Sequence, residues 1–205
     1  LPNNKESREA YRKFGKDPTR YRLSSESLLR RILKGKGIDS INNIVDINNL
    51  LSIVFFDSIG TYDVEKLVPS ILFRIGKKDE DYRGIGRGPL NIENLPVLSD
   101  RIGAFGSATS DSERTMVTME TKKIFMNRIS FHGTHDFEQY FDYAKELLEE
   151  YADAKNIESK IMPVIHISVV TAKPYAAARF DELLKFIIIK ITAISKSQLI
   201  LPMYI

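Results

Sequence analysis

Residues 41–55 form the segment that most restricts what this chain can fold into. Apolar side chains recur along it at helical spacing and cover much of the circumference, which predicts a largely buried helix. The same helix carries five short polar side chains, namely Asn42, Asn43, Asp46, Asn48 and Asn49. A buried polar group without a partner costs roughly 1–3 kcal/mol. We therefore expect these side chains to bond to the backbone, to one another or to a ligand.

A shorter helix is predicted just before it, over residues 26–34, and two glycines at 35 and 37 end it. Its apolar positions are expected to form a buried stripe, made of Leu28, Leu29, Ile32 and Leu33. Residues 1–37 hold eleven Lys or Arg and four Asp or Glu, whereas the net charge of the whole chain is only +3. The N-terminal part is therefore a basic surface on a nearly neutral body.

Such a surface suits contact with a phosphate backbone. The candidates for contact with tRNA are Arg20, Arg22, Arg30, Arg31, Lys34 and Lys36. The alternative is a solvated charged surface that keeps the protein soluble.

The remainder alternates irregularly between strand and helix signals, which favours an α+β fold. Further helices are predicted over 7–14, 136–151 and 175–186, and strands over 71–75, 95–98, 124–129, 164–170 and 187–194. A charged turn at 77–81 predicts a hairpin, residues 84–88 predict a flexible glycine-rich stretch, and residues 103–106 predict a tight turn.

Several kinds of chemistry are disfavoured by composition. The chain has no cysteine, which removes disulfides, thiolate catalysis and cysteine-based zinc sites. His132 and His135 lie close together but without a zinc-protease pattern, so we predict no metal and no cofactor. The most apolar run, 183–194, contains two lysines and is too short to span a bilayer. We expect a soluble, cytoplasmic protein with no membrane partner.

Several separate motifs, in order, resemble one known family. The runs at 25–31, 37–38 and 41–49 are similar to the B3/4 domain of the bacterial phenylalanyl-tRNA synthetase beta chain, and residues 62–67 and 103–106 extend the match. Residues 11–18, 20–22 and 110–115 are similar to stand-alone proteins of that family. The resemblance covers roughly residues 8–152.

The resemblance implies a three-layer α+β domain that contains a β-sandwich of unusual topology. We expect one domain over 1–205, with its core motifs at 8–152. Stand-alone relatives begin with a strand-helix unit, whereas here a similar unit follows at 161–190, and we expect it to pack on the same core. The implied partner is tRNA or aminoacyl-tRNA, bound by its aminoacyl-adenosine end in a cleft beside the asparagine-rich helix. The implied activity is hydrolysis of mischarged aminoacyl-tRNA, whereas ligation is not expected from this domain alone.

Residue by residue, the resemblance is uneven. Asn49 falls on the family's asparagine beside the cleft, and Gly103 falls on the glycine where backbone approaches the ligand. The synthetase's cleft histidine falls on Gly60, and its acidic residue falls near Asn127. Two polar groups used for tyrosine are therefore missing. Ester hydrolysis itself needs mainly a positioned water and donors for the oxyanion.

The proposed working cluster is Glu113, Arg114 and Thr115, because these side chains can hold an ammonium group, a carboxylate or phosphate, and an ester oxygen. The alternative is an internal salt bridge that fixes the loop. Asp46 is a further substrate-binding candidate, although capping or pairing with a basic group explains it equally well. A non-catalytic module that binds RNA, an amino acid or a nucleoside is the alternative function, and a cleft filled by side chains is a third possibility.

Overall fold

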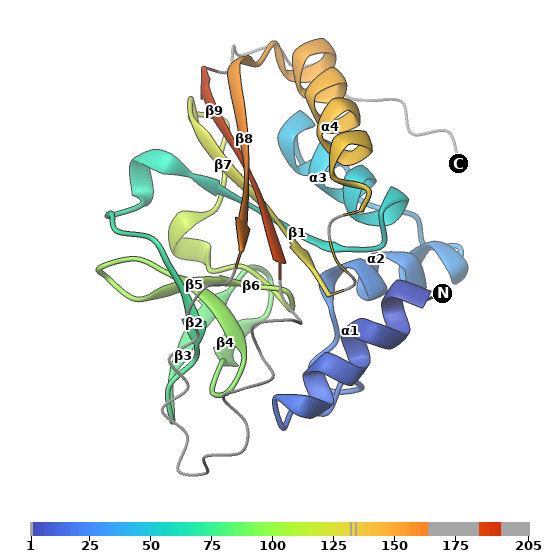
Figure 1. The fold of residues 1–205 in the computed structure, drawn as a ribbon, viewed down its shortest axis with the longest axis vertical. Coiled ribbons are helices and arrows are strands. Elements are labelled where there is room, and N and C mark those ends of the chain that lie inside the picture. Colours follow the sequence, from blue (N-terminus) through green and yellow to red (C-terminus); the bar gives the residue numbers. More distant parts are fainter. Residues whose placement is uncertain (1, 132, 134, 164–184, 194–205) are drawn as a thin grey trace.

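The computed structural model describes residues 2–131, 133, 135–163 and 185–193, shown in Figure 1. The helices are α1 (Pro2–Lys13), α2 (Ser24–Leu33), α3 (Asn43–Val54) and α4 (Phe137–Ala152), with short 3-10 turns η1 (Val64–Lys66) and η2 (Glu113–Thr115). The strands are β1 (Ser58–Asp63), β2 (Leu72–Ile75), β3 (Asp81–Gly84), β4 (Gly88–Asn91), β5 (Pro96–Ser99), β6 (Ala104–Ser107), β7 (Ile124–Ser130), β8 (Lys155–Pro163) and β9 (Lys185–Ala193).

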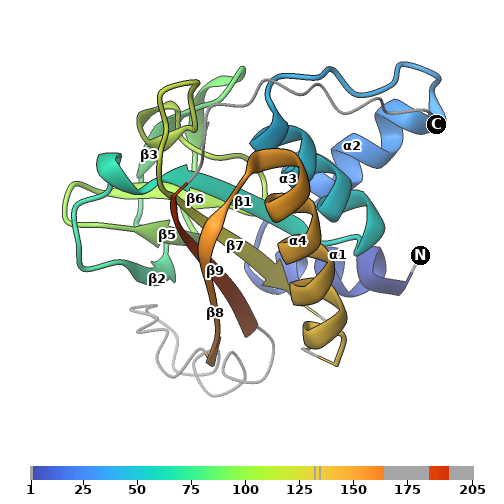
Figure 2. The same ribbon diagram turned by 90° about the horizontal axis from the view of Figure 1, so that it is seen from above.

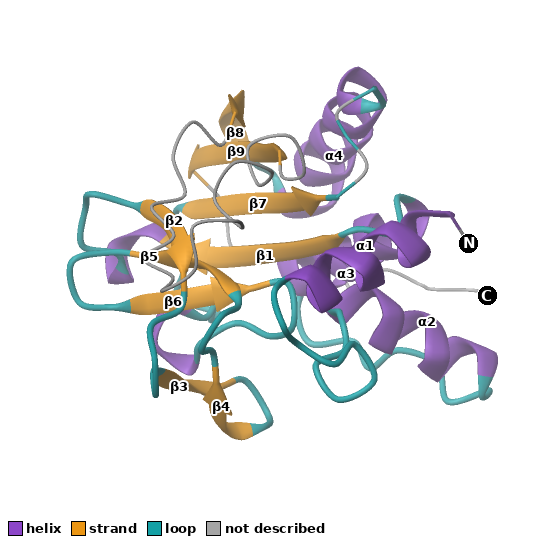
Figure 3. Cartoon of the chain, turned by 60° about the horizontal axis from the view of Figure 1, so that its bottom comes forward, coloured by secondary structure: helices purple, strands orange, loops and turns teal. Residues whose placement is uncertain are grey.

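The described strands form three antiparallel sheets in an α+β fold. The main sheet has the order β1-β7-β9-β8, the second sheet has the order β2-β5-β6, and β3 pairs with β4. Helices α3 and α4 cover one face of the main sheet (Figures 1 and 2). The second sheet lies against the other face (Figure 3), so helices, main sheet and second sheet form three layers.

Apolar side chains fill the two spaces between these layers. Ile47 and Leu51 of α3 pack with Tyr140 of α4 and Met126 of β7 on the helical side. On the other side Tyr62 of β1 packs against Leu98, Phe105 and Phe125. Helix α1 closes one end of the second sheet through a cluster that includes Tyr11 and Phe14.

The turns of the chain lie at positions that differ from those predicted from the sequence. The hairpin expected around 77–81 does not form, and β2 pairs with β5 instead. Gly76 lies so close to the Ile92 carbonyl that a Cβ would approach it within 1.9 Å. This close approach and the pairing of Arg74 with Glu80 direct the next segment into a separate sheet. The glycine-rich stretch at 84–88, expected to be flexible, is the turn that joins β3 to β4.

The tight turn expected at 103–106 is also wrong, because Ala104–Ser107 is strand β6. The turn lies just before it, where Asp100 accepts hydrogen bonds from the amides of Ile102 and Gly103. Gly106 has a different role from turning the chain. A Cβ at this position would lie 2.0 Å from the Tyr62 hydroxyl, so glycine leaves room for that ring.

Helix α2 buries a different face from the apolar stripe that the sequence predicts. Leu33 is 75% exposed and the other three leucine and isoleucine side chains are only half-buried. The buried residues are Ser25 and Glu26. The reason is electrostatic, since arginines from three segments gather around the Glu26 carboxylate and hold it inward.

The C-terminal part is described only in its strands. The strand expected at 187–194 is confirmed as β9, whereas no strand is predicted from the sequence at the position of β8. The expected strand at 164–170 and most of the helix expected over 175–186 lie outside the described residues, whereas Lys185 and Phe186, at the end of that expected helix, belong to β9. The packing of the segment 161–190 as a strand-helix unit on the same core stays a prediction. No helix in the described ranges is long and apolar enough to cross a membrane.

The polar side chains of α3 mostly bond within the fold. Asn42 accepts from the Val45 amide, Asn43 donates to the Tyr151 carbonyl, Asp46 accepts from Ser40 and the Ile41 amide, and Asn48 accepts from Thr61. Capping and tertiary bonds thus explain four of the five. Asn49 is half-buried and makes no side-chain hydrogen bond within the part of the chain that the structure describes.

Candidate functional site

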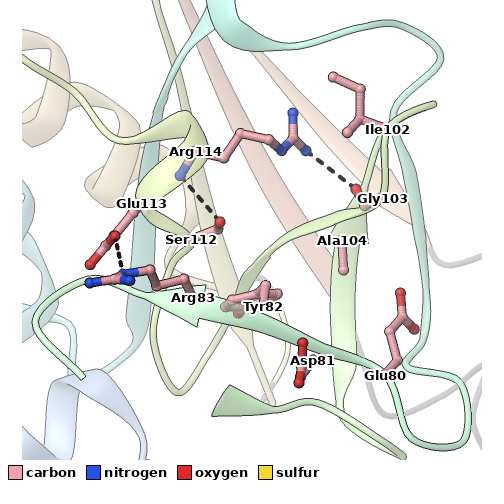
Figure 4. A pocket seen from close by; sticks show the side chains of 10 residues that line it. All are labelled: Glu80, Asp81, Tyr82, Arg83, Ile102, Gly103, Ala104, Ser112, Glu113 and Arg114. Atoms are coloured by element: carbon pink, nitrogen blue, oxygen red, sulfur yellow. Dashed lines mark hydrogen bonds and ion pairs between the residues drawn. The ribbon is translucent and has the colours of Figure 1, made fainter. Parts of the chain in front are cut away.

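A cleft of about 600 Å³ with a mixed polar and apolar lining opens between β3, the 102–104 segment and η2. Figure 4 shows its lining, which comprises Glu80, Asp81, Tyr82, Arg83, Ile102, Gly103, Ala104, Ser112, Glu113 and Arg114. The size suits a small ligand or the end of a larger one. The walls carry both signs of charge, with an apolar strip at Ile102 and Ala104.

Arg114 lines the cleft and reaches toward Gly103 (Figure 4). Its guanidinium donates to both oxygens of the buried Asp100 carboxylate, at 2.9 and 3.0 Å, and lies 3.4 Å from the Gly103 carbonyl. Burial of Asp100 opposes its ionisation, but Arg114 and the amides of Val68, Gly103 and Ile102 outweigh this and lower its pKa. The internal salt bridge considered from the sequence is therefore present. Arg114 therefore lines the cleft in a fixed position, with its charge balanced by Asp100.

Glu113 and Arg83 face each other across the mouth (Figure 4). Their side-chain atoms are 2.8 Å apart, and they are 37% and 75% exposed. An exposed pair of this kind contributes roughly 0–1 kcal/mol, so a ligand can replace it at little cost. Asp81 lies exposed on the same wall, whereas Glu80 is held by Arg74. The mouth therefore offers carboxylates and one exchangeable guanidinium.

Behind the cleft, the loop at 107–112 is held by three buried phenols. Tyr11 bonds to Thr109 at 3.0 Å, and the Tyr82 hydroxyl donates to the Ser110 carbonyl at 2.5 Å. Tyr62 donates to Asp111 at 2.6 Å. This loop runs directly into η2 and so positions Glu113 and Arg114 at the cleft. Tyrosines from three elements make that position rigid.

Asp111 is a titratable group that the sequence reasoning missed, although it lies in the quoted 110–115 motif. Burial raises the pKa of its carboxyl to about 7, and the hydrogen bond from Tyr62 opposes the rise. A polar residue between two serines gives no sequence signal of burial. Only the placement of Tyr62 beneath the loop identifies it.

The two positions where the family pattern is broken lie opposite each other in the main sheet. Gly60 on β1 pairs with Asn127 on β7. A Cβ at Gly60 would lie 2.2 Å from the Tyr62 hydroxyl, so Tyr62 occupies the space that a larger residue would need. Asn127 is fully buried, and neither atom of its amide has a hydrogen-bond partner in the described part of the chain. The space next to Gly60 is thus filled by the Tyr62 ring, and the Asn127 side chain opposite Gly60 has no hydrogen-bond partner among the described residues.

Of the six substrate-binding candidates, the cleft brings together Gly103, Glu113 and Arg114. Thr115 is fully buried behind them, and its hydroxyl has no partner among the described residues. Asp46 and Asn49 lie on α3 and do not line this cleft. Within the described ranges no group of His, Asp and Glu side chains could hold a metal ion, and His132 lies outside those ranges.

The six basic candidates all lie at least partly in solvent. Arg22 and Arg30 pair with Glu26, and Arg31 pairs with Asp39 at 2.8 Å. The other three, Arg20, Lys34 and Lys36, are exposed and have no ion pair within the described part of the chain.

The fold and the cleft define a mixed α+β domain with a polar ligand-sized site. The chain belongs to the B3/4 domain family, whose model matches residues 6–152. Over 105 residues it is 30% identical to the phenylalanine–tRNA ligase beta subunit of Fusobacterium nucleatum. The aligned segment is 50% of this chain but 13% of that subunit. The chain is therefore related to one part of a tRNA-synthetase subunit.

Proposed function

We propose that this protein binds the aminoacyl-adenosine end of a tRNA in the cleft at Gly103 and Glu113 and hydrolyses the ester of a mischarged amino acid. The observation that carries the proposal is the cleft itself, since it unites Gly103, Glu113 and Arg114, three residues that the sequence motifs single out. The relationship to a tRNA-ligase subunit supports the choice of ligand. A protein with this role acts in the cytoplasm, where tRNA is charged.

The chemistry of the walls fits the ligand. Asp81 and Glu113 suit the ammonium group of the amino acid, and the strip at Ile102 and Ala104 suits an apolar side chain. Arg83, once released from Glu113, can donate to a ribose or ester oxygen. A bound ester is already reactive, so positioning and oxyanion donors are the main requirements for its hydrolysis.

A non-catalytic binding module is the second candidate. It is favoured by the engagement of Arg114 with Asp100 and by Tyr62, which fills the interior beside Gly60. In that case the same cleft binds an aminoacyl end, an amino acid or a nucleoside without turnover.

Deacylation of a panel of mischarged tRNAs tests the proposal. We expect hydrolysis above the buffer rate for at least one tRNA, and a fall of about tenfold or more in kcat/KM for Glu113→Gln and for Arg83→Gln, which corresponds to about 1.4 kcal/mol. Glu146→Gln, an exposed carboxylate on α4, is the matched control and should leave the rate unchanged. No turnover for any tRNA would reject the enzyme and leave the binding module.

A further inference from the structure

Three arginines from separate parts of the N-terminal region meet at one buried carboxylate. The Nη1 atom of Arg8, on α1, is 3.0 Å from Oε1 of Glu26, and Nε of Arg30, on α2, is 2.8 Å from it. Nε of Arg22, in the preceding loop, is 3.7 Å from the same oxygen. We call Arg8, Arg22 and Arg30 the arginine triad.

The carboxylate of Glu26 is buried, whereas the guanidinium side chains around it are partly exposed to solvent. The Glu26 side chain is 2% exposed, while the side chains of the triad are 24%, 38% and 49% exposed. Solvent therefore meets guanidinium and not carboxylate at this place. The three arginines carry two more charges than the Glu26 carboxylate balances. Asp17 nearby interacts with both Arg8 and Arg12, so counting this carboxylate together with Arg12 leaves the excess at two.

An arrangement of this kind needs a reason, because three like charges held together repel. Glu26 offsets only part of that repulsion, and its second oxygen has no partner among the described residues. A guanidinium group has five N–H donors, and each guanidinium of the triad uses only one of them in the described hydrogen bonds. Many charge-assisted donors thus remain for an anion.

We infer that the arginine triad is a binding site for a phosphate group, with Glu26 as the positioning residue that gathers the three forks. Guanidinium forks match phosphate oxygens in geometry as well as charge, and two excess charges match a phosphate group well. The inference deepens the proposed function and rests on it for the source of the phosphate, which is the backbone of the bound RNA.

The triad is joined structurally to the cleft. The amide of Ser24, at the start of α2, donates to the Ala108 carbonyl at 2.9 Å. Ala108 belongs to the loop that leads into Glu113, and five residues of chain span at most about 18 Å. An RNA end in the cleft therefore has a phosphate within a few nucleotides of the triad.

Two probes test the site without any deacylation. In the first, inorganic phosphate is titrated into the full chain and the arginine Nε–H resonances are followed by NMR. We expect shifts for the triad and none for Arg101, an exposed arginine outside it. Arg22→Gln and Arg30→Gln should each weaken phosphate binding about fivefold or more, whereas Arg101→Gln should not.

In the second, binding of a short single-stranded RNA is measured at several salt concentrations. Each triad variant should reduce the slope of log K against log salt by about 0.7. An effect on RNA without measurable binding of free phosphate identifies the backbone as the source and supports the inference. Equal effects of the triad variants and Arg101→Gln, or no response to either probe, overturn it. Glu146→Gln, the exposed carboxylate on α4, should change neither readout. Both probes are read without deacylation, so this inference and the proposed function can fail separately.

Discussion

Replacing Gly60 by alanine should destabilise the protein strongly, chiefly because of Tyr62, although Asp111 Oδ1 would also lie close to the new Cβ, at 3.1 Å. A Cβ at Gly60 would lie 2.2 Å from the Tyr62 hydroxyl and 2.7 Å from its Cζ atom. The ring cannot retreat, because it packs edge-on against Phe105 at 4.8 Å and beneath Gly106. Overpacking of this kind costs about 1–3 kcal/mol, and loss of the bond from Tyr62 to Asp111 adds about 1–3 kcal/mol. We expect Gly60→Ala to cost about 2–6 kcal/mol in all.

The measurement is a double-mutant cycle by urea unfolding, followed by circular dichroism. Tyr62→Leu removes the clashing atoms of the ring, so Gly60→Ala in that background should cost less than about 1 kcal/mol, which gives a coupling of about 1–6 kcal/mol. Gly86→Ala is the control, since Gly86 has open space around it and should show no coupling to Tyr62. If Gly60→Ala does not fold alone, recovery of folding in the double variant is the same result. Equal costs in both backgrounds would refute the reasoning.

Two further predictions concern the buried polar groups. Asp111 ionises near pH 4 when unfolded but has a pKa of about 7 in the fold, so the native state holds the extra proton between these values. Stability should therefore fall by about 2–4 kcal/mol as pH rises from 4 to 7 and level off above. Urea midpoints across this range should show a smaller fall in Asp111→Asn, with the remaining slope from Asp57, whose pKa burial also raises to about 7 despite Arg128. Asn127→Leu removes a buried amide that has no partner among the described residues, and it should raise the unfolding free energy by about 1–3 kcal/mol in the same assay; a loss of stability would mean that the amide is satisfied.

The helices over 43–54 and 137–152 follow from hydrophobic periodicity, since each buries an apolar face. The strand over 124–130 follows from its apolar residues, although the structure buries it at every position, polar ones included. Hydrophobic periodicity does not predict which face of α2 is buried, because arginines up to 18 residues away in sequence hold Glu26 in the interior. No local pattern contains that information. The 103–106 segment fails for a similar reason, since Gly106 makes room for Tyr62 and does not turn the chain.

The sequence likewise predicted only some residues of the candidate site. The 110–115 motif identified Glu113 and Arg114, and the structure adds their partners Arg83 and Asp100, which depend on the tertiary fold. Asp111 was missed because its burial depends on Tyr62, 49 residues earlier. Asn42 and Asp46 in the helix region find their partners within a few residues, by capping that the sequence allows for, whereas the partners of Asn43 and Asn48 come from the tertiary fold.

The central claim is that the cleft between β3 and η2 receives the aminoacyl-adenosine end of tRNA. The most direct measurement is a titration with an aminoacyl-adenosine analogue in which an amide replaces the ester, followed through backbone amide resonances. We predict shifts concentrated at Arg83, Gly103 and Glu113, and affinity reduced about tenfold or more by Glu113→Gln but unchanged by Glu146→Gln. Absence of binding, or shifts centred on α3 with the cleft residues unaffected, would contradict it.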